Sequence, residues 1–333
     1  TGSDEDEISL FQDDNTFEGG SEIGIGESFG LEIKGNVRID AGSDTDHILF
    51  NQDNGGSDGG DDGFFDLNST VKMGASLTVI GGAGGSVFSN TFDFLQVVGA
   101  LRVEGGDGAD EFYFGTVVDD FFEFFSLTNE DAFLVVGGDT TITTGVDADE
   151  INFDGDTVQL LGNVTITTGA GSDEVIFESD VVEIGNFDVA TPVAKTLRIN
   201  TEGSHDHVII QTEFLATGNF EINTGDDEDY VDLSFEQSFS EIPFIAEISE
   251  PIENNILGLL RINTGADDDG DEVFIDFDMD FTIKGNLEIL TGDGSDYVEV
   301  VGAEGVATIR GDLKLDTGAS SDEAALIAED GDL

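Results

Sequence analysis

The stretch that decides the fold runs from Gly162 to Gly185 and reads GNVTITTGAGSDEVIFESDVVEIG. Apolar residues alternate with polar ones in three short bursts along it. A period of two residues is typical of β-strands, because successive side chains of a strand point to opposite faces. The stretch therefore predicts three short strands, each with two inward side chains.

The same unit recurs when the chain is aligned on one aspartate, which we call the anchor. The shortest anchor spacings are 23 to 26 residues, and longer spacings of 33 to 42 indicate the same unit with an insertion. Ser86 stands in the anchor place of a degenerate copy. The anchors are Asp6, Asp46, Asp110, Asp149, Asp173, Asp206, Asp229, Asp271, Asp296 and Asp322.

The apolar bursts keep fixed distances from the anchor. Val164 and Ile166 stand nine and seven residues before Asp173, and Val175 and Phe177 stand two and four residues after it. Most other units repeat both pairs, although Thr140 replaces an apolar residue in one of them. Because one unit cannot bury its own apolar face, the units must stack.

These observations predict an all-β fold, a triangular parallel β-helix (β-solenoid) of about 10–11 coils. Right-handed winding follows from the general rule for parallel crossovers. We expect residues 1–333 to form a single solenoid domain. Thr1-Gly2 and Gly331-Asp332-Leu333 resemble positions inside a unit, so we also expect a segment of a longer repeat protein or filament.

Insertions are expected after the second strand of several coils, at 11–30, 51–69, 115–131, 178–191 and 234–254. One of them contains an aromatic cluster, Phe121 to Phe125. This cluster either folds back over the solenoid or forms a contact surface for a partner, since exposed apolar patches usually have a role.

The charge excludes several classes of partner. Asp and Glu number 74 against 10 Lys and Arg, for a net charge of −64. A phosphate backbone or an anionic membrane would be repelled, so we expect no nucleic acid and no membrane insertion. Salt adaptation is an alternative reason for the acidity. The hydrophobic share of 38% and the 27 Phe argue against disorder.

The turn between the first and second strands carries the candidate chemistry. It reads TGAGSD at residues 168–173, and several copies hold a second acid two or three residues before the anchor. Stacked coils lie about 4.8 Å apart, so a row of carboxylates along one corner would repel itself without cations. Calcium suits such a row, because it accepts six to eight oxygen ligands in flexible geometry.

These turns resemble the calcium-binding repeat of haemolysin-type (RTX) proteins, GGxGxDxUx with U a large apolar residue. Residues 105–113 (GGDGADEFY) match every position, and 168–176 and 291–299 match with Thr for the first Gly. The resemblance implies calcium held between successive turns by carboxylates and backbone carbonyls. It departs in period, because the motif recurs once per coil here, which implies a single row of ions.

We therefore expect Ca²⁺ as the cofactor. The alternative is that these residues only form turns, with Asp bonded to its own backbone. His205 and His207 could bind zinc, but we see no third ligand. The predicted calcium ligands are Asp4, Asp6, Asp44, Asp46, Asp107, Asp110, Asp147, Asp149, Asp173, Asp206, Asp227, Asp229, Asp271, Asp293, Asp296 and Asp322.

The function expected from these features is that of a calcium-stabilised structural or adhesive solenoid, extracellular or on a cell surface. Its expected partners are neighbouring subunits end to end and cell-surface glycans. A polysaccharide-binding or polysaccharide-degrading β-helix is the alternative. The few, scattered basic residues speak against catalysis on acidic sugars. An ice-binding face would need a longer array than Thr141, Thr143, Thr165 and Thr167.

Overall fold

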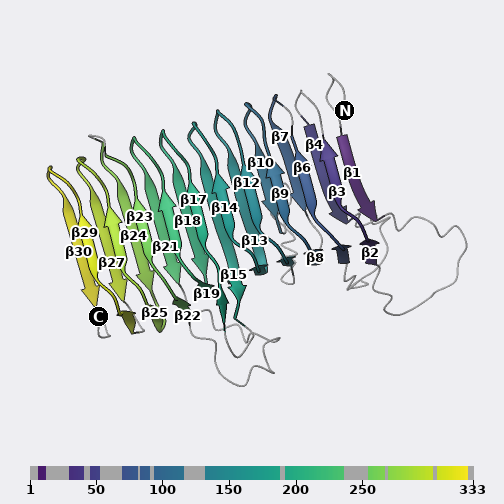
Figure 1. Ribbon diagram of the computed structural model, residues 1–333. Coiled ribbons are helices and arrows are strands. Elements are labelled where there is room, and N and C mark those ends of the chain that lie inside the picture. Colours follow the sequence, from purple (N-terminus) through teal and green to yellow (C-terminus); the bar gives the residue numbers. More distant parts are fainter. Residues whose placement is uncertain are drawn as a thin grey trace, which may run out of the picture.

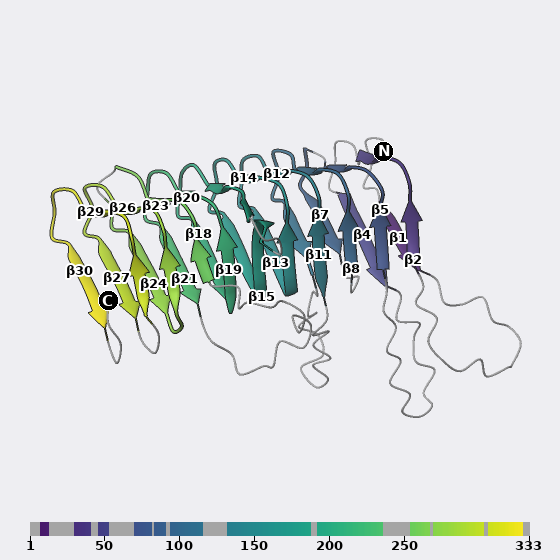
Figure 2. The same ribbon diagram turned by 60° about the horizontal axis from the view of Figure 1, so that its bottom comes forward.

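The chain winds into a stack of coils, each contributing three short strands (Figure 1). The computed structural model describes residues 7–12, 30–40, 46–52, 70–81, 83–90, 94–115, 132–187, 192–235, 254–266, 269–302 and 306–328. Within these ranges the structure is all β, and the strands of the three sides pair in parallel with their equivalents in neighbouring coils. The predicted parallel β-helix is confirmed. A view from below shows the coils side by side along one axis (Figure 2).

The first strands of the coils form a separate ten-stranded sheet. Its order along the solenoid follows the sequence without a break in register. Its strands are β3 (Val37–Asp40), β6 (Leu77–Ile80), β9 (Leu101–Glu104), β12 (Thr140–Thr143), β14 (Val164–Thr167), β17 (Leu197–Asn200), β20 (Phe220–Asn223), β23 (Leu260–Asn263), β26 (Leu287–Leu290) and β29 (Leu313–Asp316).

The second strands, which follow the anchor aspartates, form a ladder of their own. We call it the second-strand ladder. Its strands are β1 (Glu7–Gln12), β4 (Asp46–Gln52), β7 (Ser86–Asn90), β10 (Glu111–Phe114), β13 (Glu150–Leu160), β15 (Glu174–Asn186), β18 (His207–Thr212), β21 (Tyr230–Phe235), β24 (Glu272–Phe277), β27 (Tyr297–Gly302) and β30 (Glu323–Ala328).

The third strands form the remaining side. Strands β13 and β15 run on from the second side into the third, so the two ladders join into one larger sheet. The other members are β2 (Gly30–Ile33), β5 (Thr70–Met73), β8 (Phe94–Val97), β11 (Phe133–Val136), β19 (Phe214–Thr217), β22 (Asn254–Ile256), β25 (Phe281–Ile283) and β28 (Ala307–Ile309).

The core consists of inward side chains stacked on their equivalents. Ile142, Ile166 and Ile199 follow one another in the ten-stranded sheet and are fully buried. On the second side, the rings of Phe153 and Phe177 stack with centroids 4.4 Å apart. Each such side chain stabilises the fold by roughly 1.5–3 kcal/mol relative to an exposed one. The apolar alternation in the sequence therefore predicts the inward positions correctly.

Two irregular positions also follow the prediction. Thr140 takes a core position and is 1% exposed, although it is polar. Ser86 pairs in register with Asp46, so it does occupy an anchor place. The register is therefore set by the whole unit, and a single atypical residue does not shift it.

The prediction of an insertion at 178–191 is wrong. Residues up to Asn186 belong to β15, whose Val182 and Ile184 are buried core residues of the third side. The additional residues come later, where Gly185 pairs antiparallel with Ala194 of β16 (Val193–Ala194). The prediction placed the third strand by counting back from the next anchor. The extra residues lie between the third strand and the first strand of the following coil, so this count placed the third strand too late in the sequence.

The other predicted insertions are described only at their edges. Residues 11–12, 30, 51–52, 234–235 and 254 lie in strands. The middle of each of these insertions, including Phe121 to Phe125, lies outside the described residues. Within the described ranges, no helix is long and apolar enough to span a membrane.

Candidate functional site: the acidic turn and its aspartate ladder

The anchor aspartates point into the solenoid. Asp110 and Asp206 are 0% exposed, and the other anchors from Asp149 to Asp296 are at most 3% exposed. Ionised carboxylates are rarely buried so fully unless they are hydrogen-bonded or paired. The anchors therefore differ from ordinary surface turn residues.

One carboxylate oxygen of each anchor accepts a hydrogen bond from the preceding coil. The backbone N–H of Asp149 donates to Oδ1 of Asp173 at 2.9 Å, and that of Asp173 donates to Oδ1 of Asp206 at 2.9 Å. The same contact links every pair of successive anchors from Asp110 to Asp322, at 2.8 to 3.4 Å. We call this row the aspartate ladder.

The second carboxylate oxygen closes the turn of its own coil in several copies. The hydroxyls of Thr224, Thr264 and Thr291 donate to Oδ2 of Asp229, Asp271 and Asp296 at 2.5 to 2.6 Å. Gly106 N–H does the same for Asp110 at 2.8 Å. The turn threonine thus has a structural role that the sequence shows only as a recurring residue five or seven positions before the anchor.

The coil that ends at Asp271 keeps this geometry despite its two extra residues. Asp271 accepts from the N–H of Asp229 at 3.0 Å, and its own N–H donates to Asp296 at 3.1 Å. Asp269, in the extended part of the turn, is exposed. The additional length is therefore absorbed outside the ladder.

Burial raises the pKa values of the ladder carboxyls. Desolvation raises the pKa of Asp110 and of Asp206 to about 6, that of Asp149 to about 7 and that of Asp229 to about 8. It also raises the pKa of Asp173. At Asp229, hydrogen bonds from the Thr224 hydroxyl and the backbone N–H of Asp206 oppose the rise but do not cancel it. Part of the ladder therefore titrates near neutral pH.

The second acids of the turns lie outside the ladder. Asp107, Asp147, Asp227 and Asp293 are exposed, and we call them the outer acids. Asp147 and Asp227 adopt positive φ angles of 83° and 90°, a conformation that Asp tolerates better than most residues. The outer acids can therefore meet an ion from solvent without breaking a buried contact.

The outer acids do not form one continuous row. Successive turns pair through single bridges from Val146 to Ala170, Gly203 and Asp226. In this stack Gly171 and Ser204 separate the coil of Asp147 from that of Asp227. Among the described residues, no group of three or more acidic or histidine side chains could hold a metal ion. A calcium site here would need backbone or water oxygens as well.

The remaining predicted ligands fall in less complete positions. Asp322 belongs to the ladder and is partly exposed in the last coil. The backbone of Asp46 lies in β4, and its side chain lies outside the described residues, as do Asp4, Asp6 and Asp44. Calcium ligation by any of the predicted residues stays a prediction.

The two turn histidines contact different carboxylates. His205 Nε2 lies 3.8 Å from Glu228, and His207 Nδ1 lies 3.9 Å from Glu174 in another coil. His207 also packs edge-on against Tyr230, with ring centroids 5.6 Å apart. The pair therefore has separate environments, which does not favour a shared zinc ion.

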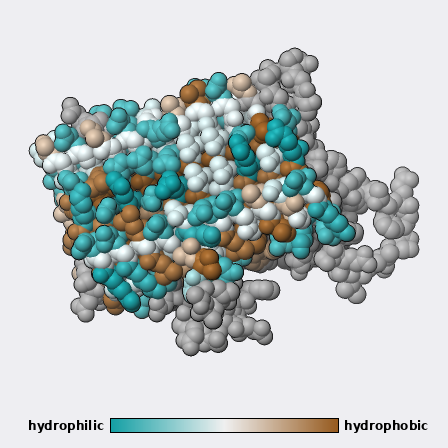
Figure 3. All heavy atoms as spheres, viewed as in Figure 1, coloured by the Kyte–Doolittle hydropathy of each residue, from teal (hydrophilic) through white to brown (hydrophobic). Residues whose placement is uncertain are grey.

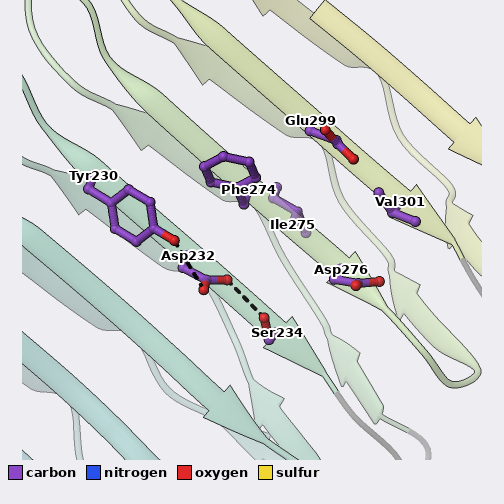
Figure 4. Close-up of a pocket in the computed structure, with 8 residues that line it drawn as sticks. All are labelled: Tyr230, Asp232, Ser234, Phe274, Ile275, Asp276, Glu299 and Val301. Carbon is purple, nitrogen blue, oxygen red and sulfur yellow. Dashed lines mark hydrogen bonds between the residues drawn. The ribbon is translucent and has the colours of Figure 1, made fainter.

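A shallow pocket lies on the outer face of the second-strand ladder, and the sequence did not reveal it. Its lining includes Tyr230, Phe274, Asp232, Asp276 and Glu299 (Figure 4). Tyr230 and Phe274 have ring centroids 5.6 Å apart. Tyr230 and Phe274 occupy outward positions in their strands. In the sequence, an aromatic residue at an outward position next to acids was the feature that could have indicated this pocket. Hydrophilic and hydrophobic residues are mixed over the face seen in Figure 3.

Fold and turn together define an acidic parallel β-solenoid with a buried aspartate ladder along one corner. Comparisons with protein-family models, with curated proteins and with solved structures give no match for this chain.

Proposed function

We propose that this chain is a calcium-stabilised structural or adhesive β-solenoid of the cell surface or extracellular space. The observation that carries the proposal is the in-register stacking of acidic turns along one corner, with the outer acids exposed. The resemblance of these turns to RTX repeats supports calcium as the ion. Calcium sites of extracellular modules bind in the range of about 0.1 to 1 mM, which suits shallow, partly hydrated sites.

The outer acids are the better ligands among the predicted residues. The second carboxylate oxygens of Asp149, Asp173 and Asp206 accept no hydrogen bond, but these groups are buried, so an ion would have to shed its water to reach them, whereas the outer acids meet solvent. Asp107 and Asp147 stand in successive coils and are exposed. We propose that calcium binds between these turns and others like them.

The end of the described solenoid supports association along the axis. In the last coil, Leu313 and Leu326 occupy core positions but are 43% and 53% exposed. Strands β29 and β30 each have one paired side among the described strands. An unpaired strand edge favours pairing with another strand. We propose that a second copy of this chain pairs with this edge end to end.

The test is thermal unfolding followed by circular dichroism in excess EGTA, in 10 mM calcium and in 10 mM magnesium. Sites with Kd values of about 0.1 to 1 mM would add about 1.4 to 2.7 kcal/mol per ion at 10 mM calcium. We expect a calcium-specific rise in melting temperature. The double variant Asp107→Asn and Asp147→Asn should reduce the rise.

The matched control is Glu111→Gln with Glu150→Gln, which removes the same charge from the second strands of the same two coils. Its calcium response should equal that of the unchanged chain. An equal response to magnesium, or no response to calcium, would contradict the calcium proposal. The acidic residues would then serve only to form the turns.

A second candidate function is binding of neutral glycans at the pocket of Figure 4. Aromatic rings beside carboxylates can stack on sugar faces and accept hydrogen bonds from hydroxyls. Binding of neutral oligosaccharides that Phe274→Ala abolishes would favour this candidate.

A further inference from the structure

The outer face of the ten-stranded sheet has a charge composition unlike the rest of the chain. It carries half of the ten basic residues and an equal number of acids. The basic residues are Arg38, Arg102, Arg198, Arg261 and Lys314, and the acids are Asp40, Glu104, Glu221, Glu288 and Asp316. In a chain of net charge −64, this face is electrically neutral.

The second-strand ladder shows the contrast. The described strands of that ladder contain no Lys or Arg. Among the described side chains, their outward acids include Glu111, Glu150, Asp154, Glu174, Glu178, Asp232, Glu272, Asp276, Glu299 and Glu323. The third-strand ladder carries few charges of either sign, among them Glu32, Lys72 and Glu183. Of the three sides, the ten-stranded sheet is therefore the one that carries several basic and several acidic residues together.

The charges on this sheet alternate in sign along the solenoid. Strand pairing places Arg198, Glu221, Arg261, Glu288 and Lys314 in one row, one residue per coil. Neighbours in the row lie about 4.8 Å apart. Arg198 forms an ion pair with Glu221 at 2.8 Å, whereas Arg261 and Glu288 make no salt bridge with each other. The row is thus only partly neutralised within the molecule.

A row of alternating charges is complementary to the same row of a second copy that runs in the opposite direction. Consider a two-fold axis in the plane of contact, parallel to the strands and midway between β20 and β23. Two antiparallel copies then face each other row against row. Glu221 meets Arg261 of the second copy, and Arg198 meets Glu288 of the second copy. A shift by one coil would place like charges opposite one another, so the alternation selects this register.

We propose that the outer face of the ten-stranded sheet, around β17, β20, β23 and β26, is a docking surface for a second antiparallel copy of this chain. The contact is lateral, so it is separate from the calcium sites and the axial pairing proposed above. Exposed acids of the turns border this face, but the outward acids of the second-strand ladder lie on another side of the solenoid. This face is therefore one on which two such acidic molecules can approach.

The test is sedimentation equilibrium of the full chain in EGTA, at concentrations up to about 100 µM, the range of weak and transient interfaces. We expect a monomer–dimer equilibrium whose Kd rises with salt, because opposite charges attract. Arg261→Glu places two like-charge contacts in each dimer and should raise the Kd by about tenfold or more. Adding Glu221→Arg restores opposite charges and should bring the Kd back within about threefold of the original.

The matched control is Arg102→Glu, the same substitution on the same face outside the overlapping coils. It should leave the Kd unchanged, and circular dichroism should show all variants folded, since exposed ion pairs contribute little to stability. A strictly monomeric chain, a Kd that falls with salt, or equal effects of Arg102→Glu and Arg261→Glu would overturn the proposal. Open-ended polymers instead of dimers would indicate axial stacking and not this face.

Discussion

Glu202 occupies a turn position that glycine holds in other coils. Gly169, Gly225 and Gly292 stand at the same place, four residues before their anchors, and all have φ near +90° to +107°. Glu202 adopts φ 79° there. A residue with a Cβ atom pays roughly 1–2 kcal/mol for this conformation, whereas glycine does not. This coil therefore contains local backbone strain.

Replacing Glu202 by glycine should raise the free energy of unfolding by about 1 kcal/mol, measured by chemical denaturation. Glu228→Gly provides the control, because Glu228 lies in the next turn without a positive φ angle. That variant should be neutral or destabilising. Equal effects of the two substitutions would show that general charge removal, and not relief of strain, explains the gain.

At the scale of elements, the aspartate ladder is a row of buried polar groups between the first and second strands of each coil. It satisfies backbone N–H groups that lie between the first and second strands, where neither sheet provides a carbonyl partner. Each link crosses 23 to 42 residues of sequence, so it exists only when coils are stacked. The ladder stabilises the stack, and its cost is a row of desolvated carboxyls.

The ladder should make stability depend on pH above the usual carboxyl range. Burial raises the folded pKa of Asp229 to about 8, well above its ordinary value of 3.8. The protonated form is thus favoured by folding, and this contribution is full below about pH 4 and is lost as pH rises through 8. We expect the melting temperature to fall between pH 5 and pH 9.

Asp229→Asn should flatten this pH dependence, because the amide oxygen still accepts the N–H of Asp206 but cannot ionise. The measurement is the melting temperature against pH for Asp229→Asn and for the control Asp227→Asn, which changes an exposed residue of the same turn. An unchanged slope in the Asp229 variant would contradict the assignment.

For the whole molecule, stability should vary along the axis. Each coil contacts only its neighbours, so an interior coil has two partners and a terminal coil has one. Leu313 is 43% exposed, whereas its equivalent Leu287 in the preceding coil is 0% exposed. The last described coil therefore lacks about half of its packing.

Hydrogen exchange should detect this gradient. The amides of β29 should exchange faster than those of β14, which lies between paired coils on both sides. If copies stack end to end, protection of β29 should increase with protein concentration, whereas β14 should not change. Equal protection of the two strands at low concentration would argue against a neighbour-dependent stack.

The alternation of apolar residues was sufficient to predict which side chains form the core. Val164 and Ile166, or Val175 and Phe177, show this period locally, and the structure buries them all. The anchor repeat likewise predicted which coils stack on which. The third strand at Val182 and Ile184 was misplaced, because an insertion moves it relative to the next anchor without changing its local pattern.

What the sequence determined by itself was thus the repeat, the strands and the corner where the acids gather, since these depend on periodicities within one unit. Only the tertiary structure decided that the anchors face inward and the outer acids face solvent. A turn carboxylate such as Asp173 can be buried only if a distant N–H donates a hydrogen bond to it, and that N–H belongs to Asp149 in another coil. The neutral face likewise arises from stacking, because residues more than 20 positions apart become neighbours only when the coils are in register.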